Sequence, residues 1–269
     1  MASPNLAKIK HKVSPSGINA YFRCPRKFDY RYIHKHWVPY QFKPYLAVGG
    51  ATHKALARHF MDEQDGKTDG KPIDVLATEY LQKERYPDDQ EQLRAEHIPQ
   101  VIQHAERALS AIPAGYTVRN VENEFKFLVA LPEVDDDVAI ASKVDLVIGT
   151  GEETYDHIDF KTGKQGGDLF QNVISRITVK DALDKARMEE GAEPLPSENL
   201  RTVVLRTSTG SYDILPSDRE SHRSAWISIR QTLGEIAEDD EWRPRPDPFV
   251  CRWCEFNQMC DAAELEPDE

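Results

Sequence analysis

Four cysteines are the residues whose type and spacing say most about the chemistry of this sequence. Cys24 lies near the start, and Cys251, Cys254 and Cys260 lie close together near the end. Intervals of two and five residues can bring three thiolates around one metal centre. A fourth thiolate from the other end of the chain would complete the shell. The sequence therefore predicts a metal centre that ties the two ends together.

Several centres fit four thiolates without a histidine. Tetrahedral zinc and an iron-sulfur cube both do, and the cysteine spacing alone leaves that choice open. Disulfides are the rival, but half-cystines so close in sequence rarely pair. The sequence shows no apolar signal segment, so we expect a cytoplasmic protein with reduced thiols.

Two aspartates and a lysine form a second group that could do chemistry. The segments 138–148 and 154–160 are predicted as antiparallel strands joined by a turn at 149–151, which places Asp145 beside Asp159. Side chains alternate along a strand, so Asp159 and Lys161 should share one face while Phe160 enters the core. Such carboxylates could hold Mg²⁺ or Mn²⁺ for phosphodiester hydrolysis, with the lysine orienting the attacking water. The alternative is a hairpin with ordinary surface charges, because D-x-K is a short pattern.

Three further residues are candidates for the same site. His53 lies on the apolar face of a helix predicted over 51–62 and opened by Gly49 and Gly50, so it is either an additional ligand or a packed helix residue. Glu122 and Glu124 lie on a strand predicted over 117–131. Each could reach the site or remain a surface strand residue.

The charge is unevenly distributed along the chain. The formal net charge is -12, yet residues 1–60 carry eleven Lys or Arg and one acid, which leaves -22 for the rest. Aromatic residues interleave with these cations: Tyr21, Phe22, Phe28, Tyr30, Tyr32, Trp37, Tyr40, Phe42 and Tyr45. This pattern could supply stacking faces for unpaired bases, with Tyr21, Arg26 and Lys27 as candidate substrate-binding residues. The other interpretation is a solvated face whose aromatic residues are core.

The elements that position these residues follow from periodicity and turn signals. Ser14 and Pro15 predict a helix that ends near Cys24 and Pro25. Further helices are predicted over 26–37, 72–85, 90–112, 169–188 and 217–236, and a second strand pair over 202–205 and 212–215. With 39% hydrophobic residues and no apolar stretch of bilayer length, we expect no membrane partner.

This pattern predicts a mixed α/β core within one domain over 1–269. We expect N-terminal helices over 14–61, a helical insertion over 62–115, a catalytic core over 116–215, and a C-terminal helix with the cysteine segment over 216–269.

Five segments, in this order, resemble a known family: SPSGINAYFRCPRKF (14–28), VGGATH (48–53), KVDL (143–146), IDFKTG (158–163) and CRWCEFNQMC (251–260). Together they resemble the RecB-like branch of the PD-(D/E)XK nucleases. Within that branch they look most like the iron-sulfur members, which include the CRISPR-associated adaptation exonuclease, the AddB nuclease domain and exonuclease V.

The resemblance implies a restriction-endonuclease-like fold, a mixed sheet flanked by helices. It implies that His53, Asp145, Asp159 and the Phe160 carbonyl bind a divalent metal and that Lys161 is catalytic. It also makes Cys24, Cys251, Cys254 and Cys260 ligands of a 4Fe-4S cluster. Gln171 is the candidate for the family's Gln-x-x-x-Tyr helix, although Ser175 stands at the tyrosine position. Val144 replaces the proline of the family name.

From these features we expect a metal-dependent exonuclease that acts on single-stranded DNA ends in repair, recombination or phage DNA processing. The rival expectation is a non-catalytic iron-sulfur subunit that binds DNA or assists assembly and keeps the nuclease fold as a scaffold. A third is a zinc-stapled binding module unrelated to nucleases.

Overall fold

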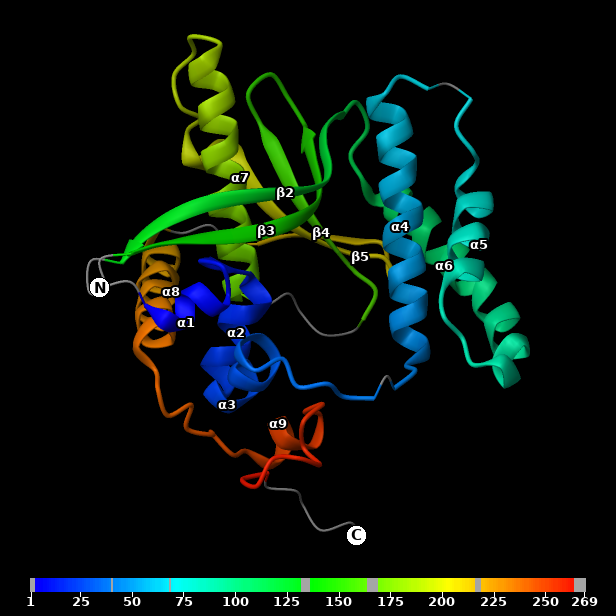
Figure 1. Ribbon diagram of the computed structural model, residues 1–269. Coiled ribbons are helices and arrows are strands. Elements are labelled where there is room, and N and C mark those ends of the chain that lie inside the picture. The colour runs from blue at the N-terminus through cyan, green and yellow to red at the C-terminus, as the bar shows by residue number, and fades with distance from the viewer. Residues whose placement is uncertain are drawn as a thin grey trace.

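The structure is a computed structural model that describes residues 3–39, 41–67, 69–131, 136–163, 169–215 and 219–263. Its centre is a six-stranded mixed sheet in the order β1-β3-β4-β5-β6, with β2 also paired to β3 (Figure 1). The strands are β1 (Lys12–Val13), β2 (Thr117–Leu131), β3 (Asp136–Gly149), β4 (Tyr155–Lys161), β5 (Leu200–Arg206) and β6 (Ser211–Ile214).

The long strand β3 organises the sheet. β2 runs antiparallel along one edge of β3, while β1 pairs with residues 139–140 and β4 with residues 146–149. The β1–β3 and β4–β5 pairs are parallel, and the remaining pairs are antiparallel. This mixed sheet with flanking helices confirms the predicted fold class.

Helices cover both faces of the sheet. On one side lie α4 (Pro44–Gln64), α5 (Ile73–Lys83) and α6 (Glu91–Ala111), with η2 (Asp88–Gln90) before α6 (Figure 1). Leu56 and Phe60 of α4 pack against Ile158 and Phe160 of β4. On the other side, α7 (Leu169–Glu189) packs through Val179 against β3, and η3 (Ser197–Asn199) precedes β5.

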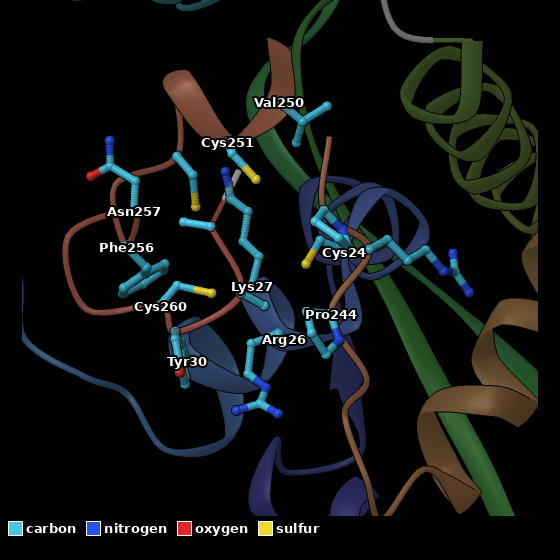
Figure 2. A pocket seen from close by; sticks show the side chains of 15 residues that line it. Cys24, Arg26, Lys27, Tyr30, Pro244, Val250, Cys251, Phe256, Asn257 and Cys260 are labelled. Carbon is cyan, nitrogen blue, oxygen red and sulfur yellow. The ribbon is translucent and has the colours of Figure 1, made fainter. Parts of the chain in front are cut away.

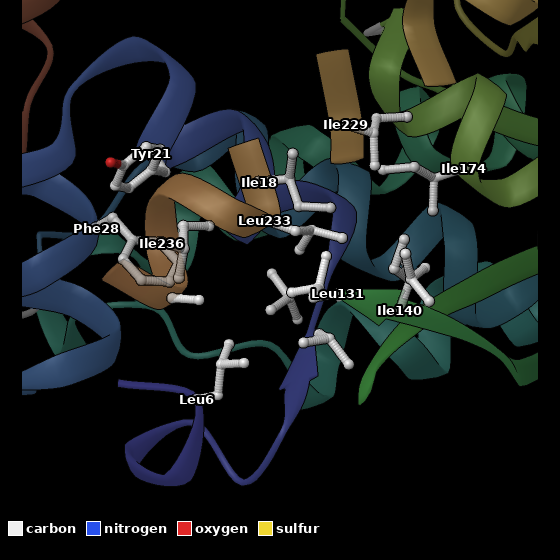
Figure 3. Close-up of a cluster of buried hydrophobic side chains, with 14 of the residues drawn as sticks. Leu6, Ile18, Tyr21, Phe28, Leu131, Ile140, Ile174, Ile229, Leu233 and Ile236 are labelled. Carbon is white, nitrogen blue, oxygen red and sulfur yellow. The ribbon is translucent and has the colours of Figure 1, made fainter. Parts of the chain in front are cut away.

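The two ends of the chain meet in a second core. It combines α1 (Pro4–Lys8), α2 (Pro15–Arg23), α3 (Pro25–Phe28), the π-helical turn η1 (Asp29–Ile33) and α8 (Arg219–Glu238) with the end of the β2–β3 ribbon. Figure 3 shows Leu6, Ile18, Leu233 and Ile236 gathered in this core. The short helix α9 (Pro248–Arg252) follows within the cysteine segment.

Several predicted elements are confirmed. The Ser14 hydroxyl accepts a hydrogen bond from the Gly17 N–H at 3.1 Å, which is the expected helix cap. The helices predicted over 72–85 and 90–112 form as α5 and α6, and the predicted strands form the hairpin β3–β4 and the pair β5–β6. The strand β3 begins at Asp136, two residues before its predicted start.

Two helix predictions were wrong. The helix predicted over 26–37 ends at Ile33, because Lys35 takes a left-handed φ of 53° and Pro39 disfavours helix in the residue before it. Gly49 and Gly50 do not open their helix but lie inside α4, which begins at Pro44. The helix α1 and the strand β1 were not predicted, although Ser3 and Pro4 begin α1 with the same cap signal as Ser14 and Pro15. Among the described helices, none has the length and apolar character needed to cross a bilayer.

Candidate functional site

The strands β3 and β4 separate at the predicted catalytic residues. Their pairing stops at Leu146 and Ile158, and beyond it the Asp145 carboxylate accepts a hydrogen bond from the Phe160 N–H at 2.8 Å. Phe160 is buried against α4, while Lys161 forms an ion pair with Asp159 at 2.8 Å. The side chains thus lie as strand alternation predicts. The Asp145 carboxylate accepts the hydrogen bond of the Phe160 N–H where the strand pairing has stopped, and this bond holds the carboxylate close to β4.

His53, Glu122 and Asp145 form a group that could hold a metal ion. Their ligand atoms all lie within 4.8 Å of one another, and His53 Nδ1 is 3.5 Å from Asp145 Oδ1. His53 lies in the middle of α4, and buried residues of the same helix such as Leu56 and Phe60 pack into the core. Three separate elements, α4, β2 and β3, therefore converge on one point.

A distortion of β2 directs Glu122 into this group. The ladder pairs Val121 with Leu146 and Asn123 with Val144, and between these pairs Glu122 has a left-handed φ of 53°. This conformation is unfavourable for a residue with a side chain, and such strained residues cluster at active sites and ligand-binding regions.

Of the two glutamates proposed from the sequence, only Glu122 lies in the group. Glu124 forms an ion pair with Lys12 of β1 at 2.6 Å. Glu122 is paired with Lys143, which is exposed on β3.

A cleft with a volume of about 590 Å³ opens beside the group. It lies between α4, α6 and the β2–β3 hairpin, and its lining includes His53, Glu122 and Asp145. α4 approaches the end of β4 so closely that a Cβ on Gly49 would lie 2.9 Å from the Thr162 hydroxyl. The glycine pair therefore permits close packing beside the cleft and does not start the helix.

The buried charges of the site affect one another. Burial disfavours the charged form of His53, yet the hydrogen bond and charge of Asp145 raise the pKa of His53 overall. Burial would raise the pKa of Asp145, but hydrogen bonds from His53 and the Phe160 N–H lower it. Burial and the negative charge of Asp145 raise the pKa of Asp159. The charge and hydrogen bond of Lys161 oppose this rise. The site thus concentrates negative charge that a divalent cation would neutralise.

The donor set fits such a cation. One imidazole nitrogen and carboxylate oxygens are ligands that Mn²⁺ accepts, and the carboxylates suit Mg²⁺. Asp159 is 7% exposed and lies beside the group, so it can add a further oxygen.

The four cysteines come together at the other end of the molecule. All four are free, and all line one pocket between α3 and the cysteine segment. Figure 2 shows the sulfur atoms of Cys24, Cys251 and Cys260 directed into the same space. The Phe256 N–H hydrogen bonds to Cys254, and burial raises the pKa of that thiol. Across residues 3–39 and 219–263, no three cysteine sulfurs lie within 4.8 Å of one another.

The predicted substrate-binding residues at the N-terminal end make contacts within the protein. Tyr21 is buried and donates a hydrogen bond to Asp239 at 2.8 Å, so its ring presents no face for a base. Arg26 donates to the Trp242 carbonyl at 3.0 Å, and Lys27 forms an ion pair with Glu255 at 3.0 Å.

Gln171 lies in the first turn of α7, where it is half-buried. It does not belong to the described lining of the cleft.

Comparison with known proteins agrees with this geometry. The family model of the PD-(D/E)XK nuclease superfamily matches residues 12–261. No curated protein matches the chain significantly. A solved structure described as "Crystal structure of SSO0001" is 11% identical, with 95% of this chain and 88% of that chain covered and a TM-score of 0.39, too low to support an argument. The chain belongs to the PD-(D/E)XK nuclease superfamily, since one family model spans the strands, the cleft and the cysteine segment.

Proposed function

We propose that this protein is a metal-dependent DNA exonuclease that acts on single-stranded ends and carries a 4Fe-4S cluster. One observation carries the proposal of catalysis. The metal-binding group of His53, Glu122 and Asp145 stands beside an Asp159–Lys161 pair where two strands separate.

The residues would divide the chemistry as follows. His53, Asp145, Asp159 and the Phe160 carbonyl would hold Mg²⁺ or Mn²⁺, with Glu122 as a further ligand. The bound ion would polarise the scissile phosphate and lower the pKa of water. Lys161, held by Asp159 at 2.8 Å, would orient the attacking water and offset charge that develops on the phosphate.

Charge supports a single-stranded substrate. The body of the protein is acidic and repels a broad duplex footprint, whereas the first 60 residues are strongly basic and aromatic. A strand threaded past a local basic region needs few phosphate contacts away from that region.

Four reduced thiols in one pocket are consistent with a cytoplasmic location.

The spacing of the thiols favours a cluster over zinc. Zinc–sulfur bonds of 2.3 Å in a tetrahedron place sulfur atoms about 3.8 Å apart. In the described cysteine segments, no three cysteine sulfurs are gathered this closely. A cube in which each thiolate binds a separate iron atom accommodates a wider spacing, and the Phe256 N–H supplies a hydrogen bond typical of ligated sulfur.

Degradation of labelled DNA tests the proposal. Linear single-stranded DNA labelled at either end and a circular single strand would be incubated with anaerobically purified protein and Mg²⁺ or Mn²⁺. We expect loss of the linear substrates, survival of the circle, and inhibition by chelator. Cleavage of the circle would refute exonuclease activity, while binding without cleavage would favour the non-catalytic scaffold.

A further inference from the structure

One exposed aromatic residue stands at the cleft that holds the candidate metal ligands. Among the described aromatic residues of the basic N-terminal stretch, Tyr21 and Phe28 are buried in the core. Phe22, Trp37 and Tyr45 remain exposed, and of these only Tyr45 lines the cleft.

Tyr45 lies in the first turn of α4, and 64% of its surface is exposed. Its neighbour Leu46 is 58% exposed and also lines the cleft. Two large side chains therefore leave apolar surface open beside a polar site, which is an arrangement that burial alone does not favour.

Two lysine side chains also line the cleft. Lys54 is held by Glu84 at 2.6 Å, and Lys143 is held by Glu122, yet both lysine side chains are more than half exposed. The cleft combines an exposed ring, two accessible ammonium groups and a metal-binding group. These groups match the parts of a nucleotide strand. The ring suits a base, and the cations suit phosphates.

We propose that Tyr45 is the stacking platform that positions the end of a single-stranded nucleic acid in the cleft. The inference rests on the proposed nuclease function and adds the residue that sets the position of the strand. Eight residues separate Tyr45 from His53 on α4, a rise of about 12 Å. That span equals about three or four stacked nucleotide steps of roughly 3.4 Å. The stacked base therefore lies within about four nucleotides of the scissile phosphate.

Fluorescence of 2-aminopurine tests this inference without cleavage. Single-stranded oligonucleotides would carry the probe at each of the first four positions from either end, and Lys161→Ala protein would prevent degradation. We expect quenching at a single position near one end. Tyr45→Ala should abolish that quenching and raise the Kd about 5- to 150-fold, the loss of one base–aromatic stack. Tyr45→Phe should retain both.

Phe249→Ala is the matched control, because Phe249 is 73% exposed but lies outside the described cleft lining. Its Kd and quenching should equal those of the Lys161→Ala parent. A Tyr45→Ala Kd within twofold of the parent, or quenching unaffected by Tyr45→Ala, overturns the inference. So does a loss of binding in Phe249→Ala as large as in Tyr45→Ala. Because cleavage by unmutated protein is measured separately, failure of the platform and failure of the nuclease proposal give different results.

Discussion

Substitution of Cys24 by serine tests whether the cysteine centre holds the C-terminal segment in place. Contacts other than the thiols also join residues 244–263 to the rest of the described protein. They include ion pairs from Lys27 and Arg31 to Glu255, a hydrogen bond from Arg245 to the Phe22 carbonyl, and the burial of Phe256.

The magnitudes of these contacts are small beside the cost of ordering the segment. Partly exposed ion pairs contribute about 0–1 kcal/mol each, a hydrogen bond about 1 kcal/mol and burial of one phenylalanine about 2–3 kcal/mol. These contacts together contribute about 3–6 kcal/mol, whereas ordering the backbone costs about 1–2 kcal/mol for each residue of the segment. If bonds to the proposed metal centre hold the segment, Cys24→Ser should leave it disordered.

The separate core should survive this change. Trp242, which precedes the segment, packs its ring against Tyr21 and Phe28 and does not depend on the cysteines. We therefore expect Cys24→Ser protein to lose iron and brown colour and to melt at a lower temperature, with the sheet and the site at Asp145 still folded.

Limited trypsin digestion with intact-mass measurement shows directly whether the segment is ordered. Arg243 and Arg245 each precede proline and resist trypsin, so Arg252 is the tryptic site within 244–263. Cys24→Ser should be cut there rapidly, while unmutated protein and a Lys27→Gln control, which loses one ion pair but no thiol, should stay intact. Full iron content together with an uncut Arg252 in Cys24→Ser would refute the reasoning.

The remaining predictions concern the candidate metal site. Asp145→Ala, Asp159→Ala and Lys161→Ala should each lower the cleavage rate at least about 10²-fold, with melting temperature and DNA affinity by anisotropy close to wild type; near-normal cleavage would remove the assignment. Glu122→Gln should weaken Mn²⁺ binding in calorimetry and recover activity at high metal, whereas unchanged affinity would mean that Glu122 is not a ligand. Asp145 raises the pKa of His53, so the ring holds its proton to higher pH than usual and must lose it to bind metal. Mn²⁺ affinity should therefore rise between pH 6 and 8, and a His53→Ala protein with the same pH slope would contradict this.

Local patterns in the sequence predicted much of the candidate site. Alternation along β4 placed Asp159 and Lys161 on one face with Phe160 in the core, because side-chain direction on a strand has a period of two. Ser14 predicted a helix cap, because a serine hydroxyl can reach the backbone N–H three residues later. The cysteine spacing predicted a common centre, and the structure brings all four thiols to one pocket.

Only the tertiary structure distinguished residues that look alike in sequence. Glu122 and Glu124 are two apart on one strand, yet the left-handed backbone at Glu122 directs it to the metal-binding group, while β1 brings Lys12 to Glu124. Tyr21 and Tyr45 belong to the same basic aromatic stretch, but α8 and Trp242 bury the first, and the second remains open at the cleft. These differences arise from pairing and packing between segments far apart in the chain, which the spacing of neighbouring residues does not encode.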